Sequence, residues 1–125
     1  MEWTPLCRSE TVESGAVVEI TVDGREVVLW RGRSGVICVM DARCPHQWSP
    51  LGAEGRVEGD ELVCTAHFWR FDREGCGTKV TVLGRRDRKA DIRVHPSRER
   101  DGVVEVMVGT AQLEGPPQAE DGVAR

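Results

Sequence analysis

Two short loops, Cys44-Pro45-His46 and Cys64-Thr65-Ala66-His67, decide how this chain is interpreted, and seventeen residues separate His46 from Cys64. Each loop offers one thiolate and one imidazole, which are donors that zinc and iron favour. Gaps of one and two residues let each loop present both of its donors to one inorganic unit. We therefore predict a metal centre held by Cys44, His46, Cys64 and His67, rather than a chance grouping of these residues.

The order of the donors along the chain favours iron over zinc. Structural zinc sites usually pair cysteine with cysteine and histidine with histidine. Here each loop contributes one of each, which suits a two-iron unit with chemically different ends. A structural Cys2His2 zinc site remains open as the alternative.

Composition indicates one soluble globular domain. The 125 residues are 39% hydrophobic and 30% charged, enough to form a core without disulfides. The five cysteines are an odd number, and the N-terminus has neither a basic segment nor an apolar run, so metal ligands or thiols are favoured over disulfides. We expect a cytoplasmic protein that does not cross a membrane.

The net charge of −4 argues against a nucleic-acid partner and suits docking on a positively charged protein surface.

Valine-rich segments between turn dipeptides predict an all-β fold. Asp23-Gly24 marks a hairpin between strands at 17–22 and 25–30, and the run 36–40 is apolar on both faces, as in a strand buried between layers. Further strands are expected at 56–58, 61–63, 69–71, 78–83, 91–94 and 103–108. Such short antiparallel strands with Gly-rich turns indicate a sandwich or barrel. Residues 1–108 would form the domain, and the Gly- and Pro-containing segment 109–125 a disordered tail.

The paired loops closely resemble those of the Rieske 2Fe-2S family. The resemblance runs from Thr4 to about Val108 and includes Pro50-Leu51-Gly52, Gly59-Asp60-Glu61-Leu62-Val63 and Trp69-Arg70-Phe71-Asp72. These stretches are similar to the Rieske domain of ring- and steroid-hydroxylating oxygenases and of their ferredoxins. The resemblance implies a Rieske-like sandwich with two cluster-binding loops and one 2Fe-2S cluster per chain. By resemblance, Cys44 and Cys64 would hold the inner iron, and His46 and His67 the outer one.

The chain departs from the family pattern beside both loops. Phe68 stands where a glycine commonly follows the second histidine, and Gln47-Trp48 where a small residue is common. We interpret the aromatic rings as packing that keeps water from the cluster, with a shaped docking surface as the alternative. The usual proline-rich third loop is replaced by the basic run 84–89, interpreted as a solvated turn, with contact to an acidic partner as the alternative.

Respiratory Rieske proteins are a poorer match. They carry an additional disulfide-bonded cysteine in each loop, and serine and tyrosine hydroxyls beside the cluster sulfur. Here Ala66, Trp69 and Phe71 occupy three of those positions, and the chain has no tyrosine. Fewer hydrogen bonds to sulfur predict a potential near the low end of the Rieske range, about −150 mV, which suits a donor to an oxygenase.

The histidine count argues against a catalytic site in this sequence. Oxygenases of this kind need a second iron bound by two histidines and a carboxylate, and only His95 remains once His46 and His67 are committed. We therefore predict a single-electron carrier, a Rieske-type ferredoxin, between a flavin-dependent reductase and a terminal oxygenase. A detached Rieske subunit of a split oxygenase or nitrite-reductase-like complex, and a zinc-stabilised binding module, remain as alternatives. We expect Cys38 to be a small core residue and His95 an ordinary strand-end residue.

Overall fold

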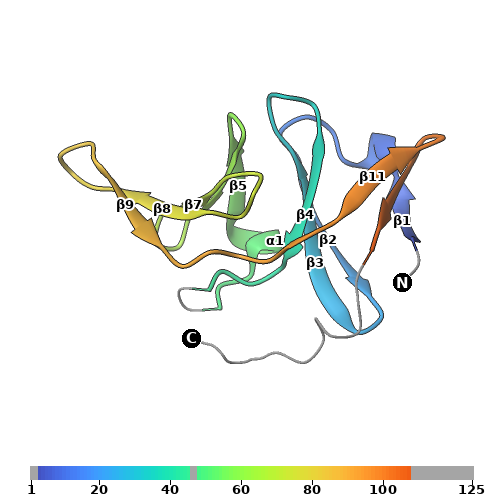
Figure 1. Cartoon of the computed structure of the whole chain (residues 1–125), viewed down its shortest axis with the longest axis horizontal. Helices are drawn as coiled ribbons and strands as arrows, with labels where there is room; N and C mark the ends of the chain where they lie inside the picture. Colours follow the sequence, from blue (N-terminus) through green and yellow to red (C-terminus); the bar gives the residue numbers. More distant parts are fainter. Residues whose placement is uncertain (1–2, 46–47, 108–125) are drawn as a thin grey trace.

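The computed structural model describes residues 3–45 and 48–107, which form three antiparallel sheets. Figure 1 shows the sheet with β5 to β9 at one end, the sheet with β2, β3 and β4 in the middle, and β1 and β11 at the other end. The expected all-β fold is confirmed. In chain order the elements are β1 (Thr4–Arg8), the 3-10 helix η1 (Ser9–Thr11), β2 (Val17–Val22), β3 (Arg25–Arg31), β4 (Ile37–Asp41), α1 (Leu51–Glu54), β5 (Gly55–Glu58), β6 (Glu61–Cys64), β7 (Trp69–Phe71), β8 (Gly77–Val80), β9 (Arg86–Lys89), β10 (Val94–His95), β11 (Ser97–Arg100) and β12 (Val103–Val106).

The middle sheet has the order β10-β4-β3-β2 and is organised by the predicted hairpin. Val22 pairs with Arg25 across the turn. Asp23 and Gly24 have φ values of 50° and 77°, as a two-residue turn with the twist of the flanking strands requires. This turn sets the register of β2 and β3, and with it the face that each side chain occupies.

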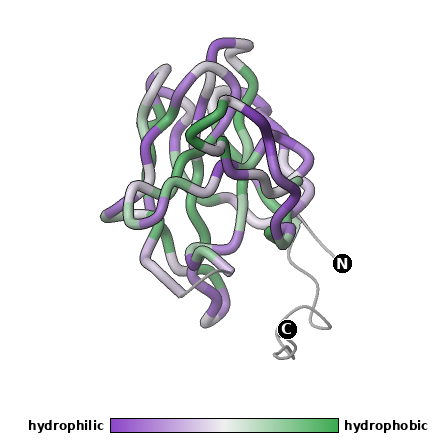
Figure 2. Tube along the Cα trace, turned by 90° about the vertical axis from the view of Figure 1, so that its left-hand side faces the viewer, coloured by the Kyte–Doolittle hydropathy of each residue, from purple (hydrophilic) through white to green (hydrophobic). Residues whose placement is uncertain are grey.

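Two apolar cores lie on opposite faces of the middle sheet. Cys38 and Met40 of β4 belong to one core, whereas Ile37 and Val39 belong to the other. These four residues are buried, so the expectation of a strand between two layers is confirmed. Figure 2 shows hydrophobic segments running through the interior of the chain and hydrophilic ones on much of its outside. Each fully buried large apolar side chain contributes roughly 1.5–3 kcal/mol of transfer free energy.

The five-stranded sheet has the order β5-β6-β7-β8-β9 and carries the second cysteine loop between β6 and β7. The first cysteine loop lies between β4 and α1. The one-turn helix α1 leads directly into β5, so the chain passes from the middle sheet into the five-stranded sheet beside both loops. No helix in the described part of the chain is long and apolar enough to cross a membrane.

Several strand predictions need correction. The strands β1, β9 and β11 were not expected, and β8 ends at Val80 rather than at residue 83. The basic run 84–89, interpreted as a turn, instead contributes Arg86–Lys89 to the edge strand β9. Arg86, Asp87 and Arg88 are exposed on this edge strand, so both of its faces tolerate charged side chains, which also discourage pairing with another chain. The predicted tail at 109–125 lies outside the described residues.

Candidate metal centre

The two cysteine loops close in the same way. The N–H of Trp48 donates to the carbonyl of Cys44 over 2.8 Å, and the N–H of Phe68 donates to the carbonyl of Cys64 over 2.6 Å. In both loops the residue four positions after the cysteine has a positive φ, 57° at Trp48 and 64° at Phe68. The cysteines therefore occupy equivalent local settings in two loops that are distant in sequence.

The helix α1 ties the two loops together. The carbonyl of Glu54, at its end, accepts hydrogen bonds from the N–H of Thr65 over 2.9 Å and from its Oγ1 over 2.8 Å. At the other end of α1, the N–H of Leu51 donates to the carbonyl of Ala42 over 2.8 Å. Gly55, the next residue after α1, pairs with Cys64 across β5 and β6. The segment after the first loop is thus fixed against the base of the second.

The described donors fit a buried inorganic cluster. Cys44 and Cys64 are each 1% exposed and belong to the same apolar core, together with Leu62 and Phe71. His67 is half-buried, with its Nδ1 inside. All five cysteines are described, and none forms a disulfide. Two cysteines in one dry environment beside an imidazole are a suitable donor set for iron and sulfide.

The remaining predicted ligand, His46, lies outside the described residues, as does Gln47. Within residues 3–45 and 48–107, no three His, Cys, Asp or Glu side chains form a set around a single metal ion. The structure places Cys44 and Cys64 in one core and His67 in the loop that Cys64 begins, and the set of four ligands stays a prediction.

Hydroxyl groups are scarce around the second loop. Thr65 carries the only hydroxyl between Cys64 and Phe71, and its Oγ1 donates to the carbonyl of Glu54. Phe71 is fully buried in the same core as Cys64. This arrangement supports the expectation that few hydroxyls are available to a sulfur atom here.

Trp48 and Phe68 belong to neither apolar core of the described chain, so their packing against a cluster stays a prediction. Both residues are 59% exposed. Each lies at the outer end of a loop whose backbone closes on the cysteine carbonyl. Because that closure determines the backbone conformation, an alternation pattern in the sequence could not reveal the direction of the rings.

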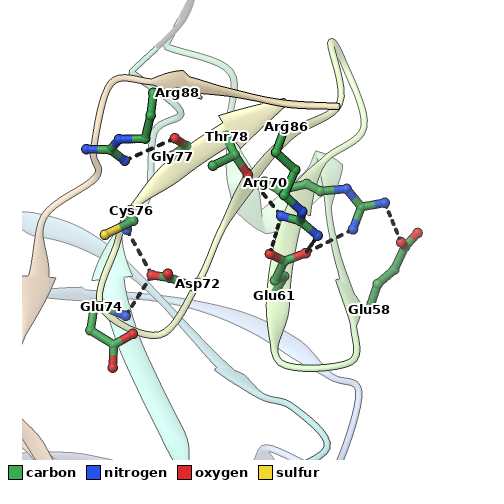
Figure 3. Close-up of polar contacts among 10 residues, drawn as sticks. All are labelled: Glu58, Glu61, Arg70, Asp72, Glu74, Cys76, Gly77, Thr78, Arg86 and Arg88. Atoms are coloured by element: carbon green, nitrogen blue, oxygen red, sulfur yellow. Dashed lines mark hydrogen bonds and ion pairs between the residues drawn. The ribbon is translucent and has the colours of Figure 1, made fainter. Parts of the chain in front are cut away.

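Ion pairs fasten β9 to the five-stranded sheet (Figure 3). The carboxylate of Glu61 accepts hydrogen bonds from Arg86 over 2.7 Å and from Arg70 over 3.2 Å, and Arg70 also donates to Glu58 over 2.8 Å. The hydrogen bond from Arg86, aided by Arg70, holds the pKa of Glu61 below its usual value although partial burial raises it. The basic run forms a strand by backbone pairing with β8, and Arg86 adds one partly exposed ion pair to β6.

A buried polar group that the sequence did not reveal lies on the other face of the middle sheet. His95 is at the end of a strand, as expected, but it is 1% exposed, and its Nε2 donates to Asp41 Oδ1 over 2.8 Å. Arg25 donates to the same oxygen over 3.0 Å. Asp41 shares its face with Val39 in the core that lacks Cys44, so this triad is separated from the cysteine loops by the sheet.

The fold and the paired loops agree with a comparison against known families. Residues 2–94 match the family model of the Rieske [2Fe-2S] domain. The chain belongs to the Rieske [2Fe-2S] domain family. Its cofactor is therefore a 2Fe-2S cluster, and the zinc-stabilised module is set aside.

This Rieske domain is similar to parts of larger oxygenases. It is 37% identical over 115 residues to the 3-chlorobenzoate-3,4-dioxygenase oxygenase subunit of Comamonas testosteroni, covering 89% of this chain and 26% of that protein. It is 36% identical over 96 residues to the 4beta-methylsterol monooxygenase of Methylococcus capsulatus, covering 72% of this chain and 25% of that protein. The chain thus spans about a quarter of the length of these relatives.

Solved structures show the same relationship. Apo dicamba monooxygenase matches with a TM-score of 0.77 and 26% identity over 92% of this chain and 35% of that chain. A chain in the reduced complex between oxygenase and ferredoxin in carbazole 1,9a-dioxygenase matches with a TM-score of 0.71 and 20% identity. The match covers 94% of this chain and 30% of that chain. The second likeness shows the fold alone. The Rieske domain described here is therefore related, by sequence and fold, to Rieske domains of aromatic-ring and sterol oxygenases.

Proposed function

We propose that this Rieske domain carries single electrons from a flavin-dependent reductase to a terminal oxygenase, with its cluster bound by Cys44, His46, Cys64 and His67. The observation that carries the proposal is the pair of equivalent loops, whose cysteines are buried in one core. The place of His46 in this ligand set rests on the sequence. A bound 2Fe-2S cluster takes up and releases one electron at a time.

The chain supplies a shielded side and an exposed side for such a cluster. Cys44 and Cys64 are anchored among apolar side chains that exclude water. In the second loop, by contrast, Ala66 and Phe68 are exposed on either side of His67. Electrons would therefore enter and leave on the histidine side, and a partner would dock against the outer ends of the two loops. The scarcity of hydroxyls near Cys64 favours a low potential, suited to a donor.

Relatives supply the class of partner. Those reported above are oxygenases, and in carbazole 1,9a-dioxygenase the oxygenase forms a complex with a ferredoxin. This chain has a net charge of −4, which suits encounter with a positively charged partner surface. Glu54, the last residue of α1, follows the first loop and would help to steer that encounter.

A detached Rieske subunit of a split oxygenase is the second candidate. The chain aligns with only 26% of the 3-chlorobenzoate-3,4-dioxygenase oxygenase subunit, which is an oxygenase component rather than a ferredoxin. In that case the partner would be a catalytic chain bound permanently. The carrier proposal predicts a transient complex instead.

Reconstitution separates the two candidates. The test uses a purified flavin-dependent reductase and a purified terminal oxygenase, the two classes of partner in the proposal. The reduced protein alone should oxidise no substrate, whereas its addition to reductase and oxygenase should accelerate turnover, and added salt should slow it. Substrate oxidation by this chain alone would contradict the carrier. Stoichiometric, inseparable co-purification with an oxygenase chain would favour the split subunit.

A further inference from the structure

The strand β9 carries charged side chains on both of its faces. On one face, Arg86 pairs with Glu61 over 2.7 Å, and Arg88 pairs with Asp91 over 3.1 Å. Because side chains alternate along a strand, Lys89 lies on the opposite face from Arg88. Lys89 is half-buried, whereas the other three residues of β9 are exposed. The strand thus turns one partly covered cation away from its exposed ion pairs.

The face on which Lys89 lies is also the face of Cys64. In the register of the sheet, Cys64 lies opposite Trp69. Phe71 lies opposite Gly77, and Gly77 lies opposite Lys89. Residues that are opposite each other, or two positions apart on one strand, share a face. Phe71 belongs to the core that contains Cys64, and Trp69 packs against that core. Cys64, Trp69 and Lys89 therefore share the core-facing side of the five-stranded sheet.

An aromatic ring holds Lys89 in place. Its Nζ lies 5.9 Å from the centroid of the Trp69 ring. Gly77, between Phe71 and Lys89 in the register, has no side chain, which leaves the stem of Lys89 room to cross β8. Within residues 3–45 and 48–107, Lys89 forms no ion pair with a carboxylate. Asp87, the acid on the same face of β9, lies opposite Lys79 instead. The ammonium charge of Lys89 therefore has no carboxylate to balance it beside the ring.

We propose that Lys89, held over the Trp69 ring, raises the reduction potential of the 2Fe-2S cluster. Reduction adds one electron, and so one negative charge, to the cluster, and a cation on the same face stabilises the reduced form. The indole ring excludes water between Lys89 and Cys64, which weakens the screening of that charge. Lys89 thereby offsets part of the effect of the scarce hydroxyls near Cys64.

The competing explanation of this contact is structural. A cation over an aromatic ring stabilises a fold weakly when it is partly exposed, and its loss would lower the Tm. A structural contact would leave the potential unchanged, whereas an electrostatic one changes it whenever the charge is removed. The potential therefore separates the two explanations. An electrode supplies and removes the one electron, so the inference depends on the cluster and not on the identity of a partner.

Voltammetry of the holoprotein at one neutral pH tests the proposal. Lys89→Met keeps an apolar stem against the ring but removes the charge. It should lower the equilibrium constant for reduction roughly threefold to tenfold, the effect of one charge at about 10 Å near a protein surface. A tenfold decrease is a potential lower by about 59 mV for one electron. Lys89→Arg keeps the charge and should keep the wild-type potential.

Arg88→Met is the matched control, because it removes one positive charge from the neighbouring residue on the other face. It should shift the potential less than Lys89→Met does. Bound iron, measured on each sample, shows which variants retain the cluster. Lys89→Gln, a second neutral variant, should give the same lowered potential and decides the matter if Lys89→Met loses iron.

Two results would overturn the inference. One is a wild-type potential in a neutral Lys89 variant that retains its iron. The other is an equal shift in Arg88→Met, which would assign the effect to net charge alone. The carrier function fails separately, because reconstitution without electron transfer to an oxygenase leaves these electrode measurements unchanged.

Discussion

Cys44 and Cys64 are not distinguished from the other cysteines by burial alone. Cys38 is 4% exposed, and burial raises the pKa of its thiol to about 12, although Arg73 lowers it. This thiol lies 3.6 Å from the carbonyl of Arg73, to which it can donate. With this raised pKa the thiol of Cys38 stays protonated at neutral pH. Cys38 is therefore a buried core residue, as expected. What distinguishes Cys44 and Cys64 is that each begins a closed loop.

Replacing either loop cysteine should remove the cluster. Cys44→Ala and Cys64→Ala each delete a thiolate that no neighbouring residue can replace, so we expect loss of the visible absorbance and of bound iron. Cys76→Ala, at a half-exposed cysteine in the turn after β7, is the matched control and should retain both. Absorbance spectra and iron analysis of the purified variants check this. An intact cluster in Cys64→Ala would contradict the ligand assignment.

Phe71 provides a test of the low potential. It is fully buried in the core that contains Cys64. In Phe71→Tyr a hydroxyl that reaches the cysteine sulfur would stabilise the additional negative charge of the reduced cluster, so we expect the potential to rise. Voltammetry measures it, with Phe71→Leu as the control that adds no hydroxyl. A wild-type potential that is already high would contradict the argument.

At the residue scale, the sequence predicted the donors but not the directions of their neighbours. Cysteine and histidine at short spacing are a local pattern, so the site could be proposed before the structure was known. The positive φ of Trp48 and Phe68 arises from loop closure, to which no residue-type pattern corresponds. Their exposure shows only that neither ring lies in an apolar core of the described chain.

At the scale of elements, Asp41 joins three strands of the middle sheet. It ends β4 and accepts hydrogen bonds from Arg25 at the start of β3 and from His95 at the end of β10. Burial raises the pKa of Asp41, but the hydrogen bond and charge of His95, together with Arg25, outweigh it, so the pKa lies below its ordinary value of 3.8. The carboxylate therefore stabilises the folded state when it is ionised.

Asp41→Asn should destabilise the domain in a pH-dependent way. We expect a loss of roughly 1.5–3 kcal/mol at neutral pH, since a charged hydrogen-bond acceptor is removed. A carboxyl with a lowered folded-state pKa contributes fully above its unfolded pKa and loses that contribution as the pH falls through the folded pKa. The difference between wild type and variant should therefore shrink below about pH 4. Urea unfolding across this range measures it, and a pH-independent difference would contradict the role of the carboxylate.

The strands that were predicted and those that were missed differ in how locally they are determined. The dipeptide Asp23-Gly24 fixes β2 and β3 within one hairpin. The strand β1 instead pairs with β12, near the other end of the described chain, and β11 completes that sheet. The strand β9 pairs with β8, and its Arg86 also reaches Glu61 of β6, a contact that no local pattern shows.

At the scale of the whole molecule, the fold holds two distant loops together. The middle sheet leads into the first loop, the five-stranded sheet carries the second, and α1 links them through Glu54 and Thr65. The sequence predicted the two loops and the sandwich class, because both follow from motifs and strand patterns. It did not predict the link, because a single turn of helix leaves no periodic pattern.

The central claim is that these loops bind a 2Fe-2S cluster through two cysteines and two histidines. Metal and acid-labile sulfide analysis combined with pulsed electron paramagnetic resonance of the reduced protein tests it most directly. The account predicts a brown protein with two irons and two sulfides per chain, and hyperfine coupling to two imidazole nitrogens. A colourless protein with stoichiometric zinc, or an iron-sulfur signal without nitrogen coupling, would contradict it.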